Sequence, residues 1–289
     1  MKVLITGTLG FIFSNLIRHV TNYYPNVSWI GVDKAVKDYN LNNMFKADNY
    51  HFHLADIADV HTMDRIFTIE KPDIVIGGAA ESFVDNSITD IMPFLHSNIV
   101  GTQVIINACL KHKVEQYIHV STDEVYGHKL SKDDSPWIET DPLQARNPYS
   151  ASKAAAEMIV IAAHNTHGLQ YKITRSCNVF GPRQKLENLV PHIIHSISNH
   201  QSINIHGNGQ NFRQYIHVED EISAFLQIMQ NGKLNTTYNI GDNNYLTNLE
   251  MVQAIAQIMK KEPHINFIAD RKAHDFGYSV NCDKLRSLG

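Results

Sequence analysis

KVLITGTLGFIFSNLIRHV, residues 2–20, begins with a short apolar run that ends at Thr6 and Gly7. An apolar run of this length, closed by a turn residue, is typical of a buried strand. From Phe11 to Val20 the apolar residues recur at helical spacing. The segment Gly7-Thr8-Leu9-Gly10 joins the two elements. A strand, a glycine turn and a helix in this order predict the start of a βαβ unit.

The same alternation continues along the chain and predicts the fold class. Further strand-like runs occupy residues 28–32, 50–55, 73–76, 116–120 and 169–174, and helical patterns occupy residues 62–69, 98–110 and 149–164. Strands that alternate with helices in this way form a doubly wound parallel sheet with helices on both faces. We therefore expect an α/β protein whose sheet domain comprises residues 1–177 and roughly 214–240.

The second half of the chain has shorter elements and longer connections. Short strands are expected at residues 202–205 and 264–268, and helices at residues 218–229 and 249–260. The stretches GPRQ and HGNGQN between them have the composition of loops. We expect residues 178–213 and 241–289 to form a smaller C-terminal α/β lobe that packs over the strand ends and binds the substrate.

Composition excludes several classes of protein. Of the 289 residues, 43% are hydrophobic and 19% are charged, which supplies a core and excludes intrinsic disorder. The 25 Lys and Arg are outnumbered by 29 Asp and Glu, so we expect no nucleic-acid partner. No stretch approaches the roughly 18 consecutive apolar residues of a membrane span, so we expect no membrane partner.

The cysteines and histidines do not form a metal or disulfide framework. The three cysteines lie far apart and include no CxxC pair, which fits a reducing, cytoplasmic location. His51 and His53 would share one face of a strand, and His192 and His195 one face of a helix. Zinc needs further ligands that neither pair has nearby in the sequence, so we expect no metal.

Gly7 and Gly10 lie where sheets of this class meet a dinucleotide. Glycine lets the backbone approach a pyrophosphate, whose charge is stabilised by the helix N-terminus. Asp33 follows the second expected strand, where a carboxylate can accept hydrogen bonds from the adenosine ribose hydroxyls. This predicts NAD as the cofactor, because a 2′-phosphate would be repelled. Lys34 and Lys37 nearby leave NADP open.

Three further features concern the same site. Asp56 and Ile57 follow the third expected strand, where they can meet the adenine. The fourth strand ends in Gly77-Gly78-Ala79-Ala80, small residues that suit close approach of the backbone to a ligand. Phe13, however, stands where a third glycine usually permits close packing of helix on strand. This residue puts the regular geometry of the first helix in question.

Tyr149 and Lys153 are four residues apart on an expected helix, so they project from one face. An ammonium group near a phenol favours the phenolate and lowers the pKa of Tyr149. Such a tyrosine can act as general base on a sugar hydroxyl while hydride leaves to a nicotinamide. Ser121-Thr122-Asp123-Glu124 follows the fifth strand, at the edge where ligands bind in this fold class.

Longer motifs resemble one family. They are AAESFVDNSI (79–88), SNIVGT (97–102), STDEVYG (121–127), PYSASKAAAE (148–157), TRSCNVFGPRQ (174–184), GNGQNFRQYIHVED (207–220), YNIGDNNYLTNLE (238–250) and DRKAHDFGYSV (270–280). Together they span nearly the whole chain and resemble the extended short-chain dehydrogenases/reductases. The Thr-Asp-Glu run is similar to the nucleotide-sugar 4,6-dehydratases. The resemblance implies a Rossmann sheet, bound NAD and a nucleotide-diphosphate sugar as substrate.

The resemblance also implies a catalytic cycle on one bound hexose. Tyr149, assisted by Lys153 and Thr122, removes the 4-hydroxyl proton while the C4 hydride passes to NAD⁺. Glu124 then takes the C5 proton, Asp123 protonates the departing 6-hydroxyl, and the hydride returns to C6. One carboxyl must be neutral and the other ionised, which adjacent carboxyls in a partly buried site can achieve. Because consecutive strand residues point to opposite faces, the loop must bend to aim both at the sugar.

Binding residues follow from the same resemblance. The residues expected to bind the cofactor are Gly7, Gly10, Phe11, Ile12, Asp33, Lys34, Asp56, Ile57, Ala79, Ala80, Asn98, Ser121, Tyr149 and Lys153. The residues expected to bind the substrate are Glu81 and Ser82 near the hexose, and Asn178, Arg213, Asn239 and Arg271 at the nucleotide diphosphate.

Four departures from the family pattern leave the base and the sugar open. Phe83 stands where His is usual, Asn86 where Arg is usual and Gln214 where Asp is usual, and Gly77-Gly78 replaces a His-x pair. The smaller side chain at Asn86 would leave room for an acetamido group. Candidate substrates are therefore dTDP-glucose, UDP-glucose and UDP-GlcNAc.

Other activities fit the same motifs. A nucleotide-sugar 4-epimerase or decarboxylase would keep Tyr149 and Lys153 but would not need Asp123 and Glu124. A 4,6-dehydratase that also epimerises C5 is a further alternative, and a catalytically silent NAD-binding protein is the alternative from another class. The helices at residues 98–110 and 149–164 carry more apolar residues than a solvated face needs, and the family resemblance implies that such helices pair across a two-fold axis in a homodimer.

Overall fold

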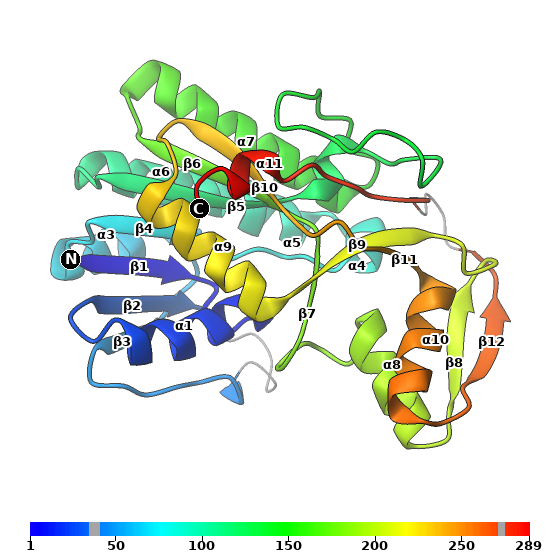
Figure 1. Ribbon diagram of the computed structural model, residues 1–289. Helices are drawn as coiled ribbons and strands as arrows, with labels where there is room; N and C mark the ends of the chain where they lie inside the picture. The colour runs from blue at the N-terminus through cyan, green and yellow to red at the C-terminus, as the bar shows by residue number, and fades with distance from the viewer. Residues whose placement is uncertain (35–40, 271–274) are drawn as a thin grey trace.

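A seven-stranded sheet forms the core of the larger part of the molecule in the computed structural model, which describes residues 1–34, 41–270 and 275–289 (Figure 1). Its strand order is β10-β6-β5-β4-β1-β2-β3, and all neighbours are parallel. The strands are β1 (Lys2–Thr6), β2 (Ser28–Asp33), β3 (Tyr50–Leu54), β4 (Ile74–Gly77), β5 (Gln116–Thr122), β6 (Tyr171–Ser176) and β10 (Thr236–Ile240). The expected α/β, doubly wound class is confirmed, and β10 adds a strand that the sequence pattern did not reveal.

Helices cover both faces of this sheet. They are α1 (Phe11–Tyr23) and α9 (Val218–Asn231) on one face, and α3 (Val60–Glu70), α6 (Thr102–Lys111) and α7 (Pro148–His167) on the other. The alternation along β1 shows why: Val3 and Ile5 pack in a cluster with α1 and α9, whereas Leu4 packs in a cluster with α3, α6 and α7. Both faces of the strand are buried, which explains its continuous apolar run.

The strand order reverses at β1, which lies between β2 and β4. At such a point the loops that follow the two central strands diverge and leave a crevice at the carboxyl edge of the sheet. Thr6 fixes the two loops relative to each other. Its hydroxyl oxygen accepts hydrogen bonds from the backbone N–H groups of Gly78 and Ala79, both at 3.0 Å.

The C-terminal part builds a smaller lobe beside this edge (Figure 1). A three-stranded sheet contains β7 (Asn178–Phe180), β9 (Phe212–His217) and β11 (Tyr245–Thr247), and a two-stranded sheet contains β8 (Ser202–His206) and β12 (His264–Ile268). Helices α8 (Leu189–Ser198) and α10 (Asn248–Met259) pack on β8 around Ile193, Ile203 and Val252. The sequence pattern does not predict β7, α8, β9 or β11.

Short segments complete the described chain. They are α4 (Val84–Thr89), α5 (Met92–Phe94), the π-helical segment η1 (Leu95–Gly101), the 3₁₀ turn η2 (Asp123–Tyr126) and α11 (Asp283–Arg286). The helix expected at residues 98–110 therefore begins earlier, as η1, and continues into α6.

Candidate active site

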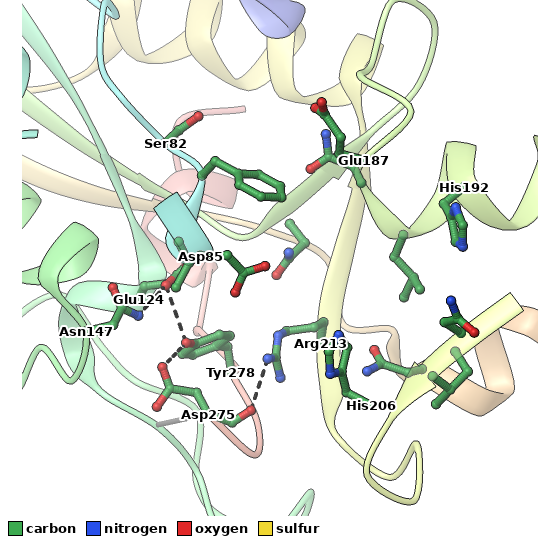
Figure 2. Close-up of a pocket in the computed structure, with 18 of the residues that line it drawn as sticks. Ser82, Asp85, Glu124, Asn147, Glu187, His192, His206, Arg213, Asp275 and Tyr278 are labelled. Atoms are coloured by element: carbon green, nitrogen blue, oxygen red, sulfur yellow. Dashed lines mark hydrogen bonds between the residues drawn. The ribbon is translucent and has the colours of Figure 1, made fainter. Parts of the chain in front are cut away.

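Two adjoining cavities lie at the carboxyl edge of the sheet. The first, of about 420 Å³, is lined by the segments after β1 to β5 and by α7, and is named the sheet-edge cavity. The second, of about 590 Å³, lies between that edge and the elements α8, β8 and β9, and is named the inter-lobe cavity (Figure 2). Ser82, Phe83, Asn178 and Asn188 line both cavities, so a long ligand could extend from one into the other.

The glycine turn after β1 shapes one end of the sheet-edge cavity. Gly7 has a φ of 82°, and a Cβ there would lie 2.9 Å from the backbone of Ala79, so a larger residue would separate the two loops. Gly10 is the N-cap of α1 and offers no side-chain cap. Gly10, Phe11 and Ile12 line the cavity at this helix start. An uncapped helix N-terminus beside a cavity is suited to an anion such as a pyrophosphate.

Asp33 ends β2 and Lys34 follows it, and both residues line the same cavity. Asp33 Oδ2 accepts a hydrogen bond from the Leu9 N–H at 2.9 Å, which anchors the carboxylate beside the glycine turn. Lys34 Nζ donates to Ser97 Oγ at 3.1 Å and lies 3.2 Å from Glu81 Oε1. The structure thus brings Glu81, expected near the hexose, together with Lys34 in the sheet-edge cavity. Lys37 lies outside the described residues.

Most of the other expected cofactor residues also reach this cavity, with one exception. Asp56, Ile57, Ala79 and Ala80 line it. Asn98 does not: it is 1% exposed, and its amide bonds to the Glu81 backbone and to Ser152 Oγ. Asn98 lies behind the cavity wall, where it ties the loop after β4 to α7.

Phe13 does not disturb the first helix. Helix α1 begins at Phe11, as the sequence pattern predicts. The Phe13 side chain is buried and meets Phe225 of α9 edge to face, with 5.7 Å between the ring centroids. The glycine usually found at this position is therefore replaced by a packing residue between α1 and α9.

Tyr149 and Lys153 enter the site from the first turns of α7. Asn147 caps this helix reciprocally with Ser150, and Pro148 occupies its first position, so the helix start is well defined. Both Tyr149 and Lys153 line the sheet-edge cavity. Lys153 Nζ donates to the Val120 carbonyl oxygen at 2.5 Å. Burial lowers the pKa of Lys153 to about 8.

The expected lowering of the Tyr149 pKa is not found. Burial raises the pKa of the phenol above its usual value, and the charges of Glu124 and Asp123 raise it further. A hydrogen bond with Thr122 acts in the opposite direction. The prediction is wrong because it considers only positive charges near the phenol, whereas folding buries the phenol and places two carboxyl groups near it.

Asp123 and Glu124 lie on η2, directly after β5. The strand ends at Thr122, whose hydroxyl oxygen accepts a hydrogen bond from the Glu124 N–H at 3.3 Å. The chain therefore turns directly after Thr122, so Asp123 and Glu124 do not continue the alternation of the strand. Thr122 Oγ1 also donates to Asp123 Oδ1 at 3.3 Å.

The environments of the two carboxyl groups differ. Asp123 is 2% exposed, its Oδ2 has no hydrogen-bond partner, and it lines neither cavity directly. Burial, followed by the charge of Glu124, raises the pKa of Asp123 to about 8, although Arg213 acts in the opposite direction. Glu124 lines the inter-lobe cavity, where its Oε2 accepts a hydrogen bond from Asn147 Nδ2 at 3.1 Å. A neutral acid beside a hydrogen-bonded carboxylate is the arrangement that acid–base chemistry requires.

Three of the expected substrate residues line the inter-lobe cavity: Ser82, Asn178 and Arg213. The Arg213 guanidinium donates to the carbonyl oxygens of Phe212 at 2.7 Å, Asp275 at 3.0 Å and Phe276 at 3.2 Å. It also stacks on the ring of Tyr278, with 4.5 Å from Cζ to the ring centroid. These contacts fix the fork of donors at the cavity wall, where it can meet an anionic group.

Asn239 lies away from both cavities. It is fully buried, its Oδ1 accepts from Tyr126 Oη at 2.7 Å, and its Nδ2 donates to the carbonyl oxygens of Trp137 and Asn281. Its amide therefore serves the packing behind η2. Arg271 lies outside the described residues.

The family departures fall in different places. Phe83 and Asn86 line the sheet-edge cavity, and Phe83 also lines the inter-lobe cavity. Gln214 is fully buried and bonds to Asp242 O and to the Val280 backbone, so this substitution serves packing and not the ligand surroundings.

Sequence reasoning missed three residues around Glu124: Asn147, Asp275 and Tyr278. Asn147 carried a signal, because it precedes the helix that starts with Pro148 and so marks an N-cap. Asp275 and Tyr278 belong to the quoted stretch DRKAHDFGYSV, but only the tertiary fold brings them to η2.

The described residues carry neither a metal-binding cluster nor a membrane-spanning helix. Within residues 1–34, 41–270 and 275–289, no three His, Cys, Asp or Glu side chains are grouped so as to hold a metal ion. The paired His53 instead bonds to Glu70 at 2.8 Å. Across the same part of the chain, helices with the length and apolar character needed to cross a membrane are absent.

Known proteins resemble this chain along its whole length. Low-salt glycan biosynthesis protein Agl12 of Haloferax volcanii is 37% identical over 292 residues, covering 100% of this chain and 93% of that protein. The dTDP-D-glucose 4,6-dehydratase of Homo sapiens is 36% identical over 300 residues, covering 100% of this chain and 84% of that protein. The resemblance to the 4,6-dehydratases is thereby confirmed.

Solved structures share the fold. DesIV, the dTDP-glucose 4,6-dehydratase from Streptomyces venezuelae solved with NAD and TYD bound, has a TM-score of 0.93 at 33% identity, covering 100% of this chain and 91% of that one. The UDP-glucose 4-epimerase of Thermotoga maritima, solved with UDP-glucose, has a TM-score of 0.91 at 26% identity, covering 100% and 93%. The model of the NAD dependent epimerase/dehydratase family matches residues 3–241. The chain belongs to the NAD dependent epimerase/dehydratase family.

Proposed function

We propose that this protein is a nucleotide-diphosphate-hexose 4,6-dehydratase that converts its substrate to the 4-keto-6-deoxy sugar. The observation that carries this proposal is the pair of unlike carboxyl groups on η2. Asp123 is buried with a pKa raised to about 8, and Glu124 lines the inter-lobe cavity. An enzyme that only moves a hydride at C4 has no need of this pair beside Tyr149.

The sheet-edge cavity fits NAD. Ser121 lines it with a buried hydroxyl that has no hydrogen-bond partner in the protein, a group that a bound ligand would satisfy. Gly7, Gly10 and the start of α1 would hold the pyrophosphate, and Asp33 the adenosine ribose. NAD bound here would accept the C4 hydride and return it to C6. The Asp33 carboxylate favours NAD over NADP.

The chain's own residues supply the proton transfers. Tyr149 would take the 4-hydroxyl proton as its phenolate, a form that the Lys153 ammonium and the positive charge of a bound nicotinamide would favour, with Thr122 as its hydrogen-bond partner. Glu124 would take the C5 proton, which the neighbouring 4-ketone makes acidic. Asp123, kept protonated by burial, would give its proton to the 6-hydroxyl as this leaves as water. The Glu124 proton would then return to C5.

The smaller lobe would hold the nucleotide. We propose that residues 1–177 with roughly 214–240 form the cofactor domain and that residues 178–213 and 241–289 bind the substrate. In support, residues 193–205 and 251–256 share a separate apolar cluster, and Arg213 lies on the wall of the inter-lobe cavity. The diphosphate would meet this guanidinium.

A panel of dTDP-glucose, UDP-glucose and UDP-GlcNAc, incubated with the protein and NAD⁺ and read by mass spectrometry, tests the proposal. We expect one of them to lose one water while NAD⁺ is regenerated. A product of unchanged mass with inverted C4 would indicate a 4-epimerase, and loss of carbon dioxide from a uronic acid analogue a decarboxylase. Inversion at C5 in a dehydrated product would indicate added 5-epimerisation. Turnover of no substrate would support a silent NAD-binding protein.

We also propose a homodimer and a cytoplasmic location. Val100 of η1 and Met158 of α7 are 47% and 49% exposed, although both are large apolar residues on segments that pack together. Exposed apolar side chains on neighbouring helices are suited to a two-fold contact. The location rests on the spacing of the three cysteines, which are all unpaired and buried.

A further inference from the structure

The hydroxyl of Tyr278 lies between two carboxyl groups. It is hydrogen-bonded to Asp275 Oδ2, and its oxygen lies 3.5 Å from Glu124 Oε2 (Figure 2). Tyr278 and Asp275 are each only 3% exposed, and both line the inter-lobe cavity. A tyrosine hydroxyl has a single proton, which it can give to only one of the two carboxyl groups at a time.

Asp275 is the group that receives this proton. Its Oδ1 accepts a hydrogen bond from Arg146 Nε at 2.9 Å, and His128 Nδ1 lies 3.9 Å away. Paired with a guanidinium, Asp275 is a carboxylate, which only accepts hydrogen bonds. It is also the closer of the two carboxyl groups. Tyr278 therefore donates to Asp275 and turns an oxygen lone pair towards Glu124.

The separation between Tyr278 and Glu124 agrees with this assignment. An O–H···O hydrogen bond spans roughly 2.5–3.0 Å. At 3.5 Å the two oxygens are further apart than that, as expected when no proton is available to lie between them. Once Glu124 has taken a proton, it can donate to the waiting Tyr278 oxygen.

We propose that Tyr278, held by Asp275, is a positioning residue that accepts a hydrogen bond from Glu124 only after Glu124 has taken the C5 proton of the sugar. This inference rests on the proposed function. In that step the C5–H bond breaks and the proton bonds to a Glu124 oxygen. The electron pair left at C5 forms the C5–C6 double bond, and the 6-hydroxyl leaves as water with the Asp123 proton.

Two groups beside Glu124 Oε2 thus stabilise different protonation states of Glu124. Asn147 Nδ2 donates to Glu124 Oε2 at 3.1 Å, which stabilises the carboxylate before the step. Tyr278 stabilises the protonated form that results from the step. An interaction that is present only after proton transfer lowers the barrier, because it is stronger in the transition state than in the ground state.

Tyr278→Phe tests this role, since it removes the hydroxyl and keeps the ring on which Arg213 stacks. The substrate is whichever of dTDP-glucose, UDP-glucose and UDP-GlcNAc the wild type dehydrates fastest. We expect elimination to slow about tenfold, the equivalent of one hydrogen bond. KM and the rate of C4 oxidation should stay unchanged. Because elimination is slower than oxidation, reduced nicotinamide should accumulate, as read by its absorbance. Substrate deuterated at C5 should show a larger isotope effect on kcat than in the wild type.

Asp275→Asn is the second variant. An amide does not hold the phenol proton as the carboxylate does, so Tyr278 no longer keeps a lone pair turned towards Glu124. We expect the same selective slowing of elimination.

Tyr238→Phe is the matched control. Tyr238 is 2% exposed, its hydroxyl accepts from the Lys233 N–H at 2.7 Å, and it lines neither cavity. It therefore reports the cost of losing a buried tyrosine hydroxyl remote from the site, and we expect both steps to be unaffected.

Three outcomes for Tyr278→Phe would overturn the inference: equal slowing of oxidation and elimination, a change confined to KM, or behaviour indistinguishable from Tyr238→Phe. If the wild type dehydrates a substrate and Tyr278→Phe eliminates water at the same rate, the inference alone fails. If the wild type releases no water from any of the three substrates, the proposed function fails and this inference fails with it.

Discussion

A side chain at Gly78 would collide with the ring of Phe13: a Cβ at Gly78 would lie 2.1 Å from Phe13 Cε2. Phe13 lies in the first turn of α1, which follows β1, and Gly78 lies in the loop after the neighbouring strand β4. Each residue departs from the family pattern. Phe13 replaces a glycine, and Gly78 lies in the Gly-Gly pair that replaces His-x. One substitution makes the space that the other fills, so the site keeps its shape.

Stability should therefore depend on Phe13 and Gly78 jointly. Gly78→Leu should destabilise the fold by about 1–3 kcal/mol through overpacking, and Phe13→Gly by roughly 3–5 kcal/mol through the cavity that it leaves. The double variant should recover about 1–3 kcal/mol relative to the sum of the single changes. Urea unfolding of the four proteins measures this coupling. Strict additivity would show that the two positions do not compensate each other.

Tyr149→Phe should abolish C4 oxidation. We expect the rate to fall by roughly 10²–10⁴-fold, since a general base is removed while the ring remains. The affinity for the nucleotide sugar should be unchanged, because the phenol lies in the sheet-edge cavity. Stopped-flow absorbance of the nicotinamide and calorimetric titration measure the two quantities. Substantial residual oxidation would assign the base to another group.

Glu124→Gln should separate the two chemical steps. The amide cannot take the C5 proton, so elimination should stop while C4 oxidation proceeds. Reduced nicotinamide and the 4-keto hexose should accumulate, as read by absorbance and rapid-quench mass spectrometry. Water release at the wild-type rate would contradict the role proposed for Glu124.

The elimination rate should fall as the pH rises through about 8. Burial raises the pKa of Asp123 to about 8, so the acid holds its proton below that pH and loses it above. The proton for the departing hydroxyl is then no longer available. The measurement must resolve elimination from oxidation by rapid quench, because the pKa of Lys153 is also about 8. Asp123→Asn should give a low elimination rate without this fall, and an unchanged fall would exclude Asp123 as its source.

The dimer should depend on Val100 and Met158. Val100→Glu together with Met158→Glu should shift the protein towards the monomer, because each places a charge where an apolar contact is proposed. Sedimentation velocity measures the association. Ile258→Glu is the control, since Ile258 of α10 is 80% exposed and lies on a different element. Equal effects of the control and the double change would refute the proposed contact surface.

Local patterns sufficed for the parts of the site that are close in sequence. The strand–turn–helix from Lys2 to Tyr23, the carboxylate at the end of β2 and the Tyr149–Lys153 pair on α7 all follow from periodicity and spacing. Asn239 could not be placed in this way, because its partners Tyr126, Trp137 and Asn281 are remote in sequence. The same holds for Gln214, which bonds to Asp242 and Val280.

By itself the sequence determined the α/β class, the glycine turn at the cofactor edge and the hydroxyl and carboxyl side chains that follow β5. Helical and strand periods can be read locally, and the carboxyl ends of parallel strands lie at one edge of the sheet. Only the tertiary structure decided how those groups behave. A pKa depends on burial and on every charge nearby. The pKa of Tyr149 is therefore raised, although the neighbouring lysine by itself predicts that it is lowered. The partners of Glu124 were decided in the same way, since folding brings Asn147 and Tyr278, remote from each other in sequence, to one oxygen.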